Sequence, residues 1–560
     1  MEMDMRTGEK GQDLGPSLKG DPDIERKRND FRSRKSPAEI VQNFVDNATT
    51  HGVTRILRSD RSRLSRLFWA VITLTALGAL LYQGSIIVID YFHRPTTTKI
   101  SLITKPELIF PAITICNLNM MRKSKVNGTR FQGLVGLDAL YQDIHGDDND
   151  YDWFYEMDSS STTTSQSPNR RRRRREVDED EASISSGLVV DYPSWDGVTD
   201  PGDWRSFYEH SQSSDFTDLQ AAVRPTREEL EAYGHTGVDL IQQCSFDGDP
   251  CTHKNFSRIQ NIRYGNCFVF NEANKLKNAS VIRTSRTGSQ YGLHLTLLVE
   301  QPEYIGVLTP EAGVVVAIHD PSVFAFPEDD GISLSTGQAT SIGLRRSYIT
   351  RLEDPYGDCV DGNQDYYNPQ MYNFSQRSCS KMCLEKAMLK ECKCVTDILV
   401  NGTMCSPINQ TERACRTSVL KKYIRNKLNC QCENPCFETV YIPTISTSRW
   451  PTERYEEHLY ARLANKSEKA ARFLLNKEHS SKNLVRLKIF FQELNFESVV
   501  ETPLITIETL FGSVGGLMGL YIGMSVISAC EILVFIAQLV RSVCCKSNER
   551  RPNVIKVTGT

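Results

Sequence analysis

The sequence lacks the patterns that would indicate an enzyme or a nucleic-acid-binding protein. Its 66 basic and 69 acidic residues leave a net charge of only −3. The basic residues cluster beside apolar segments rather than along one long basic face. The sequence has no nucleophile elbow, no phosphate-binding glycine loop after a strand and no cluster of metal-ligand residues. We therefore expect no enzymatic activity, no cofactor or bound metal, and no nucleic acid among the partners.

Long apolar runs are also scarce, and the two that occur lie near the ends of the chain. Residues 67–89 carry no charge and are long enough to cross a bilayer core of about 30 Å. The second run, 504–540, is interrupted only by Glu508, Glu531 and Gln538. Each run predicts a transmembrane helix, and the polar residues that precede the first run argue against a signal peptide.

The charges that flank the two runs predict how the chain crosses the membrane. Arginines precede the first run, and basic residues follow the second. The positive-inside rule therefore places 1–66 and 541–560 in the cytoplasm and 90–503 outside the cell. This is the topology of a multi-pass protein of the plasma membrane.

The segment 90–503 has two features that fit an extracellular environment. It contains the Asn-x-Ser/Thr sequons that N-glycosylation requires. These are Asn127, Asn255, Asn278, Asn373, Asn401, Asn409 and Asn465. It also holds fourteen of the 17 cysteines, an even number that indicates disulfides in an oxidising compartment. A zinc site is the alternative, but Cys392-Lys-Cys394 and Cys430-Gln-Cys432 lack the usual ligand spacing and a nearby histidine.

The composition changes between Asp147 and Asp203, where Asp, Ser, Thr and Gly dominate. An unbroken run of arginines, Arg170 to Arg175, lies in the middle of this stretch. The pattern predicts a solvated loop. The arginine run also matches the dibasic pattern that secretory-pathway convertases cut, so cleavage there is one interpretation and an uncut charged loop is the other.

Local patterns predict several elements outside the membrane. Residues 36–57 read as a cytoplasmic helix, 107–116 as a strand that leaves the membrane, and 485–491 as a half-buried strand before the second run. The two spans would then continue into two strands of one extracellular core.

The cysteine-rich block from Cys379 to Cys436 reads as helical. Cys379 and Cys383 lie on one helix face, and residues 421–428 predict a second, short helix. Cys430 and Cys432 follow in an extended segment, where they point the same way. Such a block predicts a ladder of disulfides, which is a stiff lever rather than a reactive centre.

The second apolar run has two kinds of unusual residue. Gly512, Gly516, Gly519 and Gly523 fall within about 60° of one another on a helix, and this stripe is either a close helix contact or a narrow pore wall. The polar residues Ser525, Ser528 and Glu531 lie about 80° to 180° from the stripe. If they also face a pore, the helix is interrupted near 523–525, where freed carbonyls can coordinate an ion. Glu531 is either a carboxylate on a cation pathway or a snorkelling acid near the inner interface.

Taken together, the motifs of residues 40–540 resemble those of the epithelial sodium channel, degenerin and acid-sensing ion channel superfamily. Their order and spacing are more specific than any one of them. They are His51-Gly52, Phe110–Asn117 (Phe-Pro-Ala-Ile-Thr-Ile-Cys-Asn), Tyr264–Asn271, Tyr356–Cys359, Cys430–Cys436 and Gly515–Ser525.

The resemblance implies a membrane α+β fold and a trimer around a central pore. Two transmembrane helices would carry a large disulfide-rich extracellular domain with palm, finger, thumb, knuckle and β-ball parts. The finger would span about 120–245, with the arginine-rich loop, and the thumb about 359–436. The implied disulfides are Cys116–Cys267, Cys244–Cys251, Cys359–Cys436, Cys379–Cys432, Cys383–Cys430, Cys392–Cys415 and Cys394–Cys405.

The resemblance also implies roles for individual residues. The selectivity filter falls on Gly523, Met524 and Ser525, and Gly516, Gly519, Ser528 and Glu531 would line the pore or attract cations. In the family, a bulky side chain at one position holds the pore open, and this position falls near Thr509. The family position on which amiloride block depends falls on Gly512. His51 and Gly52 match the cytoplasmic gating pair.

Three departures from the family pattern affect the expected function. Met524 stands where Ala or Ser is usual, which bears on the selectivity for sodium over potassium. The His pair and acidic pair of proton-gated members are replaced by Pro95, Thr96, Ser101 and Leu102, which disfavours direct proton gating. Arg94 and Tyr356 stand where the family pairs two aromatics, and we expect a cation–π contact between them to couple the thumb to the first span.

The expected protein is therefore a subunit of a homo- or hetero-trimeric, voltage-insensitive, amiloride-sensitive channel that conducts Na⁺ across a lipid membrane. Two gating modes stay open: proteolysis of the arginine-rich loop, and an extracellular ligand such as a short peptide. The alternatives are a proton-gated member of the same family and a two-span receptor or adhesion protein without a pore.

Overall fold

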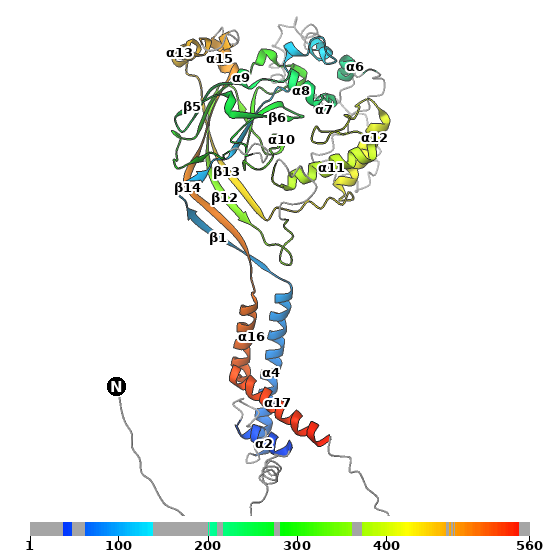
Figure 1. Cartoon of the computed structure of the whole chain (residues 1–560), viewed down its shortest axis with the longest axis vertical. Coiled ribbons are helices and arrows are strands. Elements are labelled where there is room, and N and C mark those ends of the chain that lie inside the picture. The colour runs from blue at the N-terminus through cyan, green and yellow to red at the C-terminus, as the bar shows by residue number, and fades with distance from the viewer. Residues whose placement is uncertain are drawn as a thin grey trace, which may run out of the picture. The chain divides into compact units, whose positions relative to one another are not determined.

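The computed structural model describes residues 37–47, 56, 62–137, 200, 202–209, 217–273, 280–360, 372–465, 470–471, 474 and 477–547. The chain divides into two compact units. The first combines Met1–Thr96 with Pro503–Thr560, and the second is Thr97–Thr502. Figure 1 shows the elements of both units.

Among the described residues of the first unit, one continuous helix is long and apolar enough to cross a membrane, α4 (Arg63–Phe92). It is longer than the predicted 67–89 because Ser62 caps its N-terminus and accepts a hydrogen bond from the amide of Ser65. None of its residues, all of which are described, is buried within the chain. The hydroxyl groups of Thr73 and Thr75 donate to carbonyls one turn earlier, so they need no partner in lipid.

The second apolar run is not a single helix over 504–540. It forms α16 (Ile507–Ile522) and α17 (Val526–Ser547), whose axes are bent by 81° at a break between them. The sequence indicated a break at this place. A helix of 16 residues is about 24 Å long, which is shorter than the bilayer core.

Two contacts within the first unit tie these helices together. The amide of Leu504, just before α16, donates to the carbonyl of Pro95, just after α4, at 2.9 Å. A short helix, α2 (Pro37–Asn47), packs against α17, where the rings of Phe44 and Phe535 stack with centroids 4.2 Å apart. This helix covers the first half of the predicted helix 36–57; residues 48–55 and Leu57 lie outside the described residues.

The second unit is built on two β-sheets. The larger has seven strands in the order β13-β12-β14-β9-β4-β5, with β1 paired to β14. Its strands are β1 (Thr96–Thr104), β4 (Ile241–Phe246), β5 (Asp249–Cys251), β9 (Leu293–Leu298), β12 (Gln338–Thr350), β13 (Phe437–Arg449) and β14 (Leu484–Pro503). The smaller sheet has the order β11-β10-β3-β7-β6. Its strands are β3 (Ala112–Asn117), β6 (Phe256–Asn261), β7 (Gly265–Phe270), β10 (Gly313–His319) and β11 (Ile332–Ser335).

The hydrophobic core of this unit draws side chains from both sheets. Phe110 is fully buried and contacts the rings of Phe246, Phe270 and Phe491 edge-on, with centroids 5.0 to 6.3 Å apart. The predicted strand 485–491 is confirmed as part of β14, where alternate residues are buried. Packing of both sheets around aromatic rings holds the strands that lead to the membrane.

One predicted strand is wrong. Residues 107–116 do not form the strand that follows the first span; β1 does. They form β2 (Leu108–Ile109), which pairs with β8 (Arg283–Thr284), and most of β3. Pro111, which has no backbone N–H to donate, separates β2 from β3. The prediction that both spans continue into strands of one core is confirmed, because β1 and β14 pair.

Helices lie around the sheets (Figure 1). They are α6 (Trp204–Glu209), α7 (Thr217–Ala222), α8 (Arg227–Tyr233), α9 (Gly237–Leu240), α10 (Pro327–Asp330), α11 (Gln376–Cys392), α12 (Gln410–Ile424), α13 (Glu453–Ala464) and α15 (Lys477–Asn483). The short helix predicted at 421–428 is misplaced. The helix is α12, which begins earlier because Asn409 caps it and accepts from the amides of Thr411 and Glu412.

Candidate functional site

The break in the second span is centred on Gly523. This residue has φ 69° and ψ 24°, the left-handed conformation that glycine adopts without strain, and it ends α16. Its amide donates to the carbonyl of Gly519 at 3.1 Å, and the amide of Met524 donates to the carbonyl of Met518 at 3.2 Å. Among the described residues, no backbone amide donates to the carbonyls of Gly523 and Met524. These carbonyls are therefore free to coordinate an ion.

Two serines hold the other side of the break. Ser525 caps α17: its hydroxyl accepts from the amide of Ser528, and its own amide donates to the Ser528 hydroxyl, both at 3.3 Å. The two hydroxyl groups also lie 3.3 Å apart. Ser528 is buried within the chain, so it supports the break rather than lining an open surface. Glu531 lies one turn further along α17 and is half-buried.

The glycine stripe of α16 is open within the chain. A Cβ atom added at Gly512, Gly515 or Gly516 would meet nothing within 4 Å, and one at Gly519 would meet only the carbonyl of Met524 at 3.8 Å. The half-buried residues of α16 lie on the opposite face, toward α4. They are Leu510, Ser513, Val514, Leu517, Met518, Tyr521 and Ile522. The stripe is therefore not a contact between the two spans of one chain.

The N-terminus of α16 carries another cap. The hydroxyl of Thr506 accepts from the amide of Thr509 at 3.3 Å, and the two hydroxyl groups lie 3.0 Å apart. Thr509 is thus the third residue of the helix and is exposed. Sequence reasoning did not predict the roles of Thr506 and Ser525 as caps, although a Ser or Thr before an apolar run is the signal for them.

The extracellular cysteines form the same seven disulfides that the family resemblance implies. Two of them, Cys116–Cys267 and Cys244–Cys251, join neighbouring strands. The other five lie in and around α11 and α12 and are Cys359–Cys436, Cys379–Cys432, Cys383–Cys430, Cys392–Cys415 and Cys394–Cys405. We call residues 359–436, with these five disulfides, the thumb.

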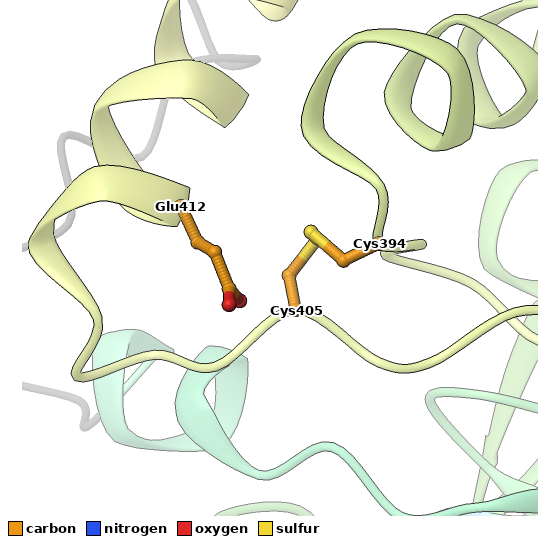
Figure 2. Close-up of side chains that lie close together, drawn as sticks. All are labelled: Cys394, Cys405 and Glu412. Atoms are coloured by element: carbon orange, nitrogen blue, oxygen red, sulfur yellow. A yellow bond between two sulfur atoms is a disulfide. The ribbon is translucent and has the colours of Figure 1, made fainter.

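One cluster in the thumb has the composition of a metal site. Figure 2 shows Cys394, Cys405 and Glu412 close together. The two sulfur atoms are bonded to each other, so neither is a thiolate that could bind zinc. Glu412 accepts from the amide of Ser406 at 2.7 Å and from the side-chain amide of Asn409 at 3.0 Å. The cluster therefore stabilises the start of α12 and does not fit a metal ion.

The thumb is joined to the large sheet at its base. The side chain of Arg351 pairs with Glu438 at 2.6 Å and donates to the carbonyl of Pro435 at 2.9 Å. The amide of Leu352 donates to Glu501 of β14 at 3.2 Å. Leu352 lies in the segment that leads from β12 to the thumb, and β14 leads to the second span, so Glu501 links that segment to β14. Sequence reasoning missed Glu501, since nothing local marks a contact across 149 residues.

A second contact holds the thumb against α10. Lys381 of α11 pairs with Glu328 and Asp329 of α10, and its ammonium group lies 4.5 Å from the centre of the Phe326 ring. Arg377 of the same helix pairs with Asp330. The pairing raises the pKa of Lys381 against the effect of its burial, so the ammonium group stays charged.

The expected contact between Arg94 and Tyr356 stays a prediction, because the two residues belong to different units. Arg94 follows α4 in the left-handed conformation with φ 52°. Tyr356 lies in a turn in which its amide donates to the carbonyl of Glu353 at 3.1 Å.

Several predicted site residues lie outside the described residues. These are His51, Gly52, Arg170, Arg175 and Asn278. The other sequon residues, Asn127, Asn255, Asn373, Asn401, Asn409 and Asn465, are all exposed. Their exposure is what N-glycosylation requires.

The sequence is similar to known proteins over most of its length. The family model described as "Amiloride-sensitive sodium channel" matches residues 44–535. The gamma-2 subunit of the epithelial sodium channel from Xenopus laevis is 27% identical over 540 residues, which cover 88% of this chain and 79% of the relative. The alpha subunit from Cavia porcellus is 28% identical over 547 residues, with 90% and 76% covered. The alpha subunit from Homo sapiens is 27% identical over 545 residues, with 90% and 78% covered.

Proposed function

The chain belongs to the amiloride-sensitive sodium channel family, and on this premise we propose that it is one subunit of a trimeric, voltage-insensitive, sodium-selective channel of the plasma membrane. In this proposal 1–66 and 541–560 are cytoplasmic, and 90–503 is extracellular. The trimer could consist of three copies of this chain, or it could combine this chain with subunits similar to those of the epithelial sodium channels.

The break at Gly523 is the observation that carries the proposal. Irregular backbone at membrane depth is tolerated where it lines a water-filled path. The free carbonyls of Gly523 and Met524, repeated in each subunit around an axis, would replace the hydration shell of Na⁺. The Met524 side chain would then point away from the ion, since the backbone does the coordination.

The open stripe of α16 supports the same arrangement. No side chain of the first span covers Gly512, Gly515 or Gly516, so the backbone there is accessible to neighbouring subunits and to the pore. We assign to Gly512 the position on which amiloride block depends. We assign to Thr509 the position at which a bulky side chain holds the pore open. Glu531 would attract cations below the break.

Gating would begin in the extracellular unit. The thumb is stiffened by five disulfides, and Glu501 of β14 accepts from the amide of Leu352, in the segment that leads from β12 to the thumb. A peptide ligand, or cleavage at Arg170–Arg175, would shift the finger against the thumb, and β14 would pass this shift to α16. Arg94 and Tyr356 would form a second coupling contact, and His51 and Gly52 would act from the cytoplasm.

The test is to express the chain in oocytes, alone and together with epithelial sodium channel subunits, and to record current under voltage clamp. External sodium is exchanged for potassium, and amiloride, trypsin, acid and short peptides are applied in turn. A sodium current that amiloride reduces supports the channel. Enlargement by trypsin identifies proteolytic tuning, whereas a current that appears only with a peptide identifies ligand gating.

Two variants separate a channel from a two-span receptor or adhesion protein. Glu531→Gln removes the carboxylate, and Cys530→Ser changes the neighbouring exposed residue as a matched control. The first is expected to reduce sodium current and the second to leave it unchanged. The proposal would be contradicted if the chain reached the cell surface but carried no current under any of these conditions, either alone or with a partner subunit.

A further inference from the structure

The outward face of thumb helix α12 is a basic groove. The groove has a volume of about 730 Å³, and its lining contains five basic residues and no acidic one. The basic residues are Arg413, Lys421, Lys422, Arg425 and Lys427. From Arg413 to Arg425 the helix and its end extend about 18 Å, so the groove is an elongated strip of positive charge.

The five charges of the groove differ in their partners. Lys422 pairs with Glu391 of α11 at 2.6 Å, and Arg413 has an interaction within the chain. Lys421, Arg425 and Lys427 are exposed, and within the described ranges no acidic side chain pairs with them. Lys421 and Arg425 are four residues apart on one helix face, where like charges repel each other. Basic residues in the last turn of a helix interact favourably with the helix dipole. Lys427 lies beyond the helix end, so this interaction does not explain its charge.

The groove sits on a rigid support. The opposite face of α12 buries Arg416 and Val419 against the rest of the thumb. The disulfide Cys392–Cys415 joins α12 to α11. Because this backbone is held in place, an anionic partner would not have to order it on binding.

We propose that the groove on α12 binds a sulfated polysaccharide of the extracellular matrix. Arginine and lysine side chains form strong, charge-assisted hydrogen bonds with anionic oxygens. A linear chain of sulfates matches an elongated strip of positive charge better than a single anion does. The face belongs to the disulfide-bonded segment, which is extracellular in the proposed topology, and there sulfated polysaccharides are the abundant polyanions. The channel proposal does not depend on this site.

The experiment measures binding of the full-length, detergent-solubilised protein to immobilised heparin as a function of salt. The test variant is Lys421→Gln/Arg425→Gln/Lys427→Gln, which keeps the side-chain stems. The matched control, Lys125→Gln/Lys254→Gln/Arg454→Gln, removes the same charge from exposed positions outside the groove. Unsulfated hyaluronan and vesicles with phosphatidylserine serve as comparison polyanions.

Wild-type protein and the matched control are expected to elute from heparin at similar salt. The groove variant should elute earlier, with the slope of log affinity against log salt lowered by about two to three. Hyaluronan should bind more weakly than heparin because it lacks sulfate. Surface expression and sodium current of the groove variant should match wild type, which would show that the variant folds.

Three results would overturn the inference. The first is that heparin does not retain wild-type protein at physiological salt. The second is that both triple variants lose heparin binding equally. The third is that the protein binds the vesicles more strongly than heparin and that this binding depends on the same residues. The last result would assign the groove to lipid headgroups.

Discussion

The second membrane span and the thumb both change chain direction, but they hold the change in different ways. The span turns at Gly523 and is held by a few hydrogen bonds from Ser525, Ser528 and the end of α16. The thumb turns between α11 and α12 and is held by disulfides. A helix cap stabilises by about 1 kcal/mol, whereas a disulfide contributes about 2–4 kcal/mol. The difference indicates a rigid lever outside the membrane and an easily rearranged turn inside it.

The largest expected effect comes from loosening the thumb. Removing one disulfide with Cys383→Ser/Cys430→Ser is expected to cost about 2–5 kcal/mol of stability, because it frees a long loop in the unfolded chain. Thermal unfolding of the purified protein and its surface expression measure this loss. Cys530→Ser, which affects a free cysteine of α17, should change neither. Equal thermal stability of the double variant and wild type would contradict a rigid thumb.

The next effect is a pH dependence inside the thumb. Burial, together with the nearby carboxylates of Glu385 and Glu328, raises the pKa of Asp397 to about 6, although Lys381 opposes this shift. The raised folded-state value means that the folded thumb binds a proton that the unfolded chain has lost. Stability should therefore increase as the pH falls from about 7 to about 4, by roughly 2 kcal/mol for this half-buried group.

Replacing Asp397 with asparagine tests this dependence. Asp397→Asn should flatten the change in melting temperature between pH 4 and pH 7, and Asp249→Asn, at an exposed position, should preserve it. A variant that keeps the full pH dependence would show that other groups carry it.

A smaller effect in free energy is expected at the turn in the membrane, although the functional consequence is large. Gly523→Ala places a Cβ at φ 69°, which costs about 1–2 kcal/mol. The turn should shift and the permeability ratio of sodium to potassium should fall, as reversal potentials would report. Gly78→Ala is the control, since a Cβ at Gly78 of α4 meets nothing within 4 Å. An unchanged ratio in Gly523→Ala would remove Gly523 from the filter.

The smallest expected effect concerns the cap of α17. Ser528→Ala removes the hydroxyl that accepts from the amide of Ser525 and should cost about 1 kcal/mol. Open-channel noise and single-channel conductance would reveal a less ordered turn. Ser528→Thr, which keeps a hydroxyl, should behave like wild type. If both variants conduct alike, the cap is not what holds the turn.

By itself, the sequence determined the two apolar runs and the position of the break in the second span, and its flanking charges predict the topology. These properties are local: an uncharged run, a cluster of arginines or a glycine followed by polar residues acts over a few turns of helix. The same reasoning indicated the half-buried strand 485–491, because alternation of apolar and polar residues is also local. The disulfide pairing came instead from the family resemblance.

Only the tertiary structure decided which distant residues meet. It located the strand after the first span in β1 rather than at 107–116, and it moved the second thumb helix from 421–428 to α12. It also brought Glu501 to Leu352 and left the glycine stripe open on the side away from α4. It gathered Lys421, Arg425 and Lys427, which pair with no described acidic side chain, in one groove along α12 and its end. The physical reason is that burial and pairing across a hundred or more residues depend on how the sheets pack together, and no local pattern carries that information.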